Sequence, residues 1–134
     1  MSSGFVHLHT HSSYSPMWGS PTLEALCQAA RTQGQDRLAL TDTNGLYGAI
    51  RFLEVAKHEG LKPILGAELV HKAHRAVLLA KTPAGYANLC RLLSARHEES
   101  TFDFIATVAR YRAGLIILSD DLSALRTWRK DSPK

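Results

Sequence analysis

The chain opens on an alternating segment with a histidine at every second position, Phe5-Val6-His7-Leu8-His9-Thr10-His11-Ser12-Ser13-Tyr14-Ser15. Because a β-strand sends alternate side chains to one face, an extended segment over residues 5–10 would gather the three imidazoles and turn the apolar side chains toward a core. Neutral imidazole is the commonest protein ligand for ions such as zinc and manganese. The spacing predicts a strand that carries a metal site. The alternatives are an edge strand that merely bears histidines and a tag remnant, although a tag would lack the interleaved apolar residues.

The composition is typical of a single globular domain. The chain has 134 residues, 45% of them hydrophobic, which is enough for one core. We find no apolar run long enough to cross a bilayer and no secretory signal, so we expect a cytoplasmic protein without membrane contact. Cys27 and Cys90 fall on the apolar stripes of predicted helices. They are predicted to be buried free thiols, as in a reducing compartment.

The formal net charge is +4, and basic residues gather in the second half at Arg91, Arg96, Arg110, Arg112, Arg126, Arg129 and Lys130. Such a surface suits a polyanion such as nucleic acid. Charged outer faces are also ordinary on helices, so charge alone leaves both interpretations open.

Apolar strand-like runs alternate with amphipathic helical segments along the chain. Strands are predicted at residues 5–10, 38–41, 62–69, 75–81 and 114–118. Helices are predicted to start at Thr22, after Gly45, at Pro83, near Phe102 and after Asp121. This alternation predicts an α/β fold with βαβ units and a largely parallel sheet, either open or closed as a barrel.

Metal-ligand residue types stand at the ends of the first three predicted strands. His9 and His11 close the first, Asp42 follows the second and Glu68 the third. Ligands of such folds gather at the carboxyl ends of parallel strands, so we expect these side chains to meet. An acidic side chain there could bridge two ions. The plainer alternatives are a turn-forming or helix-capping Asp42 and a surface salt bridge for Glu68.

The remaining histidines are predicted to lie on the surface. His58 and His97 fall near helix ends, where the helix dipole favours a cation. His71 and His74 fall in the stretch from Glu68 to Arg75, which is predicted to be a loop.

Besides residues 5–15, three further stretches form motifs: Leu38-Ala39-Leu40-Thr41-Asp42 with residues 44–52, Gly60-Leu61-Lys62-Pro63-Ile64-Leu65-Gly66-Ala67-Glu68, and Leu78-Leu79-Ala80-Lys81 with residues 85–92 and 114–119. Together these motifs resemble the polymerase and histidinol phosphatase (PHP) family, and most of all the PHP region at the N-terminus of bacterial DNA polymerase III alpha subunits. The motifs span nearly the whole chain, and the last group is similar to the polymerase branch in particular.

The resemblance implies a distorted (β/α)7 barrel, of which this chain would supply the first five or so strands and the helices between them. It implies that His9, His11, Asp42 and Glu68 are metal ligands, with His97 as a further ligand. His7 would orient these ligands or donate a hydrogen bond to a neighbouring carboxylate, and we count His7, Asp42 and Glu68 as the candidate catalytic residues. The expected ions are zinc or manganese, two or three in an intact family site and fewer here.

The chain also departs from the family pattern. Thr43 stands where the second motif usually has a histidine, and Arg75 stands where relatives often place one, with His74 one residue early. The later family motifs have no counterpart before Lys134. We therefore expect residues 1–134 to form one PHP-like domain that is truncated at its C-terminus, with a frayed tail at 130–134.

The function that the resemblance implies is a metal-dependent phosphoesterase of the 3′–5′ exonuclease type, in the PHP domain of a replicative DNA polymerase III alpha-like protein. Its partners would be DNA, the rest of the polymerase holoenzyme and a phosphate ester substrate. The alternatives are a stand-alone PHP phosphatase, a non-catalytic domain for structure or subunit contacts, and an unrelated amidohydrolase-like barrel.

Overall fold

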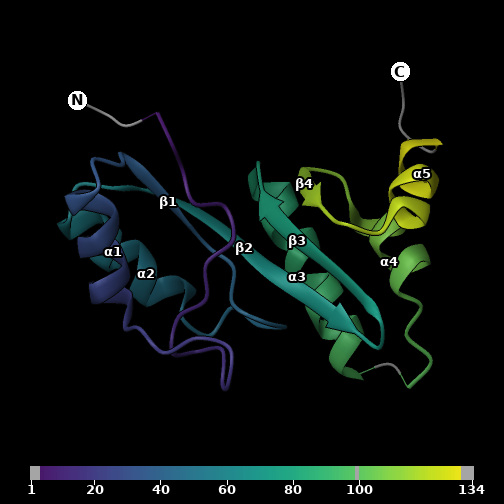
Figure 1. The fold of residues 1–134 in the computed structure, drawn as a ribbon. Helices are drawn as coiled ribbons and strands as arrows, with labels where there is room; N and C mark the ends of the chain where they lie inside the picture. The colour runs from purple at the N-terminus through teal and green to yellow at the C-terminus, as the bar shows by residue number, and fades with distance from the viewer. Residues whose placement is uncertain (1–3, 99, 131–134) are drawn as a thin grey trace.

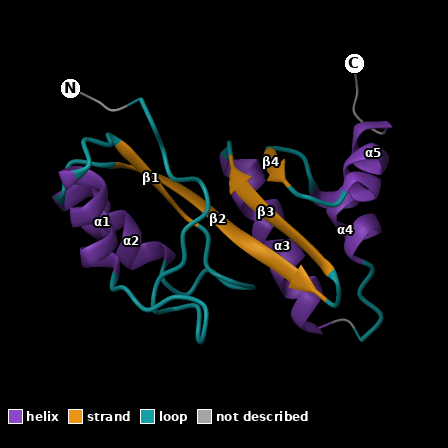
Figure 2. Cartoon of the chain, in the orientation of Figure 1, coloured by secondary structure: helices purple, strands orange, loops and turns teal. Residues whose placement is uncertain are grey.

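A mixed four-stranded sheet packs against two groups of helices, one toward each edge of the sheet (Figures 1 and 2). The computed structural model describes residues 4–98 and 100–130. In chain order the elements are α1 (Leu23–Thr32), β1 (Arg37–Leu40), α2 (Ala49–His58), β2 (Lys62–His71), β3 (His74–Ala80), α3 (Pro83–Glu98), α4 (Phe104–Tyr111), β4 (Leu115–Leu118) and α5 (Leu122–Lys130). The predicted α/β class is confirmed. Most of the predicted tail, residues 131–134, lies outside the described residues.

The sheet is less parallel than predicted. Its order is β1-β2-β3-β4, and only β1 and β2 run parallel, joined by α2 as a crossover. The pairs β2–β3 and β3–β4 are antiparallel. The predicted loop between Glu68 and Arg75 is wrong, because β2 continues to His71 and a two-residue turn leads directly into β3. A connection that short can only join antiparallel strands.

The first predicted strand is also absent, so the described residues contain four strands and not five. Residues 5–11 still run beside β1, where Ala39 N–H donates to the His7 carbonyl (3.1 Å) and Thr41 N–H donates to the Thr10 carbonyl (2.9 Å). Between these bonds, the Thr10 hydroxyl donates to the Ala39 carbonyl, and the Thr10 N–H donates to the Thr41 hydroxyl. Side chains thus replace part of the backbone ladder, which alternation in the sequence does not reveal.

The helix boundaries agree well with the local signals. The Thr22 hydroxyl accepts from the Ala25 N–H at the start of α1 (3.2 Å). Gly34 follows the end of this helix with φ +76°, a conformation that glycine adopts without steric cost.

Cys27 is buried as predicted and Cys90 is half-buried, and both are free thiols. Burial raises the pKa of the Cys27 thiol to about 11.

Two hydrophobic cores hold the sheet in place. One face of β2 and β3 packs against α3, which in turn contacts α4, and α4 contacts α5. Their side chains form one cluster that includes Leu69, Leu78, Leu89 and Trp128. A second cluster joins α1 and α2 to β1 around Phe52. The opposite face of β2 and β3 carries only a small cluster with Val77 and Leu79, and it is on this face that Glu68 lies. No helix of the described part has the length and apolarity required to span a membrane.

Candidate metal centre

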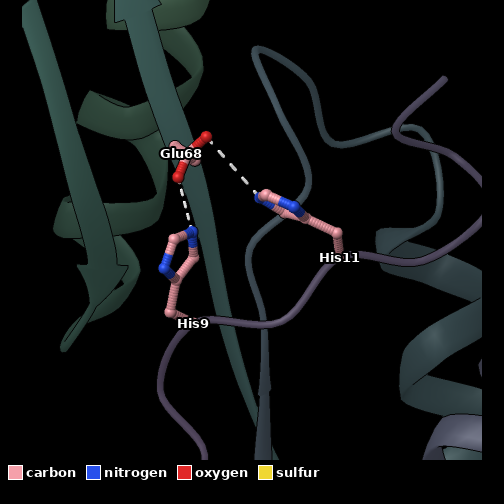
Figure 3. A group of neighbouring side chains, drawn as sticks. All are labelled: His9, His11 and Glu68. Atoms are coloured by element: carbon pink, nitrogen blue, oxygen red, sulfur yellow. Dashed lines mark ion pairs between the residues drawn. The ribbon is translucent and has the colours of Figure 1, made fainter. Parts of the chain in front are cut away.

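Three side chains from two distant segments converge beside β2. His9 and His11 come from the N-terminal segment and Glu68 comes from β2, and both imidazoles point toward its carboxylate (Figure 3). His9 Nε2 lies 2.5 Å from Glu68 Oε2, and His11 Nε2 lies 3.6 Å from Glu68 Oε1. One ligand atom from each residue lies within 4.8 Å of the others, and this is the one such group among the described residues.

Backbone pairing fixes Glu68 in this position. The Glu68 N–H donates to the Asp42 carbonyl (3.1 Å), and the Asn44 N–H donates to the Glu68 carbonyl (2.8 Å). Thr43 therefore forms a parallel bridge with Glu68 beyond the end of β1. The site lies at the carboxyl end of the parallel pair, where ligands gather in α/β folds. Glu68 itself is three residues before the end of β2, not at its end as predicted.

The chemistry of this group fits a bound cation. The Glu68 side chain is 1% exposed and that of His11 15%. Neither Glu68 oxygen nor His11 Nε2 has a hydrogen-bond partner among the described residues. His9 Nε2 and Glu68 Oε2 lie within ion-pair distance but do not form a hydrogen bond. A buried carboxylate without hydrogen bonds is costly, whereas two imidazoles and a carboxylate suit ions such as zinc or manganese.

Asp42 is buried next to this group, but its carboxylate is engaged elsewhere. It accepts from the Ser12 N–H (2.7 Å), the Ser12 hydroxyl (2.8 Å) and the Ser15 hydroxyl (2.7 Å). The Ser15 hydroxyl in turn accepts from the Thr43 N–H (2.9 Å). Asp42 thus fastens the loop that follows His11. The sequence pattern did not mark Ser12 and Ser15 as partners of this carboxylate, although both follow His11 within four residues.

Two other predicted site residues lie outside the group. His7 is exposed, with its ring edge-on to Phe5 at 4.9 Å between centroids, and its backbone N–H donates to Gln35 Oε1 (3.4 Å). His97, also exposed, donates from Nε2 to the Asn44 carbonyl (2.8 Å). His97 therefore supports the turn that carries Thr43, and a role for either histidine at the metal stays a prediction.

Of the remaining predicted features, His74 has local structural partners and the Thr43 hydroxyl has none within the described part of the chain. His74 donates from Nδ1 to Asp121 Oδ2 (3.1 Å) and stacks on Phe104. Hydrogen bonds from Ser123, from the Ala124 N–H and from His74 lower the pKa of Asp121 to about 2. The Thr43 hydroxyl, at the position where the family usually has histidine, is buried without a hydrogen-bond partner among the described residues.

Comparison with known families and proteins gives a consistent result. The PHP domain family matches residues 7–127. The chain is 47% identical over 94 residues to an error-prone DNA polymerase from Symbiobacterium thermophilum, which covers 69% of this chain and 9% of that polymerase. It is 35% identical over 140 residues to the DNA polymerase III subunit alpha of Treponema pallidum, covering 89% of this chain and 12% of that subunit. The chain thus spans about a tenth of the length of these curated relatives.

A solved structure shares the fold. It is a candidate metal-dependent phosphoesterase from Bifidobacterium adolescentis, with a TM-score of 0.52 and 17% sequence identity. The match covers 85% of this chain and 46% of the solved chain. At this identity the likeness concerns the arrangement of strands and helices.

Proposed function

The chain belongs to the PHP domain family, and we propose that His9, His11 and Glu68 bind a divalent zinc or manganese ion in a phosphoesterase site. The observation that carries the proposal is the group of buried ligand atoms that have no hydrogen bond among the described residues, Glu68 Oε1, Glu68 Oε2 and His11 Nε2. The family match and the metal-dependent phosphoesterase fold support it.

Each residue of the site then has a distinct part. Glu68 supplies the negative charge, held by backbone bonds to residues 42 and 44. His11 approaches from a loop that Asp42 fixes through Ser12 and Ser15. His9 is 46% exposed and forms the side of the site that a substrate would approach. When bound, such an ion lowers the pKa of water and offsets charge on phosphoryl oxygens.

Asp42 would coordinate an ion only if its existing hydrogen bonds leave an oxygen lone pair for it. Its two oxygens already accept three hydrogen bonds from Ser12 and Ser15. To coordinate an ion, the carboxylate would have to use a remaining lone pair or release a serine. We therefore assign it first to positioning His11.

The relatives suggest the setting. Because the polymerase matches cover 69% and 89% of this chain, we propose that the domain serves a DNA polymerase III alpha-like protein in the cytoplasm. Its substrate would be the phosphodiester at a DNA 3′ end. The polymerase holoenzyme would be its partner.

A non-catalytic, structural role is the second candidate. The observation that favours it is Thr43, whose hydroxyl occupies the usual place of an imidazole ligand and has no hydrogen-bond partner among the described residues. A hydroxyl is a weaker ligand than imidazole for zinc-like ions. A domain of this kind would bind metal without hydrolysing a phosphate ester.

Hydrolysis assays on Glu68→Gln test the proposal. The 134-residue chain would be assayed with manganese on a single-stranded DNA 3′ end and on bis(p-nitrophenyl) phosphate. We expect hydrolysis by the wild type, only the background rate for Glu68→Gln, and wild-type rates for Glu54→Gln, which changes a carboxylate on the surface of α2. Equal rates for wild type and Glu68→Gln would contradict the assignment. Manganese binding without hydrolysis would favour the structural role.

A further inference from the structure

A hollow of about 320 Å³ adjoins the metal centre, and a single arginine lines it together with His9 and Glu68. We propose that this residue, Arg75, binds the phosphate group of the substrate and positions it against the metal centre. The proposal rests on the proposed function, because it assigns the phosphate to the same site. It would make Arg75 a substrate-positioning residue.

The sheet register places Arg75 on the correct face. Glu68 pairs with Val77, and Val70 pairs with Arg75, in the antiparallel β2–β3 ladder. Residues two apart on a strand share a face and lie about 6.8 Å apart. Arg75 therefore projects from the same face as Glu68, one pair further along, which is a distance that an arginine side chain can span.

The walls of the hollow suit a phosphate ester. Its lining includes His9 and Glu68, the apolar Val77 and Leu118, and the polar Ser119 and Asp120. Arg75 is the one formally cationic residue of this lining. A planar guanidinium offers paired donors that match two phosphate oxygens.

Arg75 is available for such a ligand. Its side chain is 50% exposed, and its ion-pair partner Asp120 is 81% exposed at 3.9 Å. Charge-assisted hydrogen bonds are usually about 2.7–2.9 Å long, so this pair is a loose surface contact. By contrast, Arg51 holds Glu24 at 2.7 Å on the surface of α2. A phosphate could replace Asp120 at Arg75 at little cost.

Charge predicts that phosphate binding depends on the metal. Without an ion, the carboxylates of Glu68 and Asp120 face the hollow and repel an anion. A divalent cation at His9, His11 and Glu68 would reverse this balance. Because coupling between two ligands is reciprocal, inorganic phosphate should also tighten manganese binding.

Calorimetric titrations measure the binding of manganese and of inorganic phosphate separately. Manganese would be titrated into the 134-residue chain, and inorganic phosphate then titrated into the manganese-loaded protein. We expect Arg75→Gln to bind manganese like the wild type and to bind phosphate about tenfold more weakly or worse, from loss of a charged donor. Asp120→Asn should bind phosphate at least as tightly as the wild type, because it removes the competing carboxylate. Arg91→Gln, a surface change on α3, is the matched control.

The outcomes distinguish the two proposals. Unchanged phosphate affinity in Arg75→Gln, with normal manganese binding, would overturn the role of Arg75 and leave the metal centre intact. Weakened phosphate binding in Asp120→Asn would also count against it. Failure of the wild type to bind manganese would overturn both the metal centre and this inference.

Discussion

At the scale of single residues, Asp42 was predicted to be a metal ligand, but its carboxylate holds the loop that follows His11. It is buried, and its oxygens accept three hydrogen bonds from Ser12 and Ser15. Glu68 is equally buried but has no hydrogen-bond partner among the described residues. The two acids therefore differ in their surroundings: Asp42 fixes a loop, and Glu68 keeps the carboxylate that we propose as a metal ligand.

Replacing Asp42 by alanine should destabilise the fold. Three buried donors would lose their acceptor, and we expect the free energy of unfolding to fall by about 2–4 kcal/mol. Urea unfolding followed by circular dichroism measures this. Asp36→Ala is the control, since the Asp36 side chain pairs with Arg37 on the surface and its loss should change stability by less than about 0.5 kcal/mol. Similar losses in the two variants would contradict the anchor role.

The residue identities at the site were predictable, but their partners were not. The alternation in residues 5–15 and the position of Glu68 pointed to the three residues that meet. Nothing in spacing tells whether a carboxylate next to serines will bind them or a metal, because that depends on which groups lie within about 3 Å after folding. The same limit applies to His97, whose acceptor is a backbone carbonyl.

At the scale of elements, the sequence predicted the helix caps but not the β2–β3 hairpin. Thr22 marks the start of α1 and Gly34 follows its end, as their chemistry predicts. The β2–β3 turn uses Lys72 at φ +54°, a conformation that Asn or Gly usually supplies in such turns. With His71 and His74 on either side and no glycine, the sequence lacked the signal of a tight hairpin, and the sheet was expected to be more parallel than it is.

The start of α5 should give the fold a measurable acid dependence. Asp121 accepts from the Ser123 and Ala124 N–H groups and from the Ser123 hydroxyl. Its pKa falls from 3.8 to about 2 on folding. A lowered folded-state pKa adds stability above the unfolded value, and this stability is lost as the pH falls from about 4 toward 2.

Urea midpoints measured between pH 2 and pH 6 test this dependence. The Asp121→Asn variant should lose less stability than the wild type over the lower part of that range, because it cannot titrate. Other carboxylates contribute equally to both curves. Parallel curves for the two proteins would show that Asp121 is not responsible.

At the scale of the whole molecule, the chain shares its fold with about half of a longer solved chain. It covers 46% of the solved phosphoesterase chain with which it shares that fold. In the described part, β4 forms an edge of the sheet and leaves Ile116 and Leu118 exposed. The candidate metal centre lies between the N-terminal segment and β2 (Figure 3), and the hollow beside it reaches Leu118 of β4. An ion there would tie the start of the chain to the centre of the sheet, and so should stabilise the whole fold.

Zinc titration by calorimetry on the wild type and on His9→Ala combined with His11→Ala tests the central claim most directly. We expect the wild type to bind zinc and the double variant to lose that binding, while His58→Ala, a change at an exposed histidine beside Glu59, should bind zinc as the wild type does. Equal zinc affinity in the wild type and the folded double variant would show that these histidines do not hold the ion.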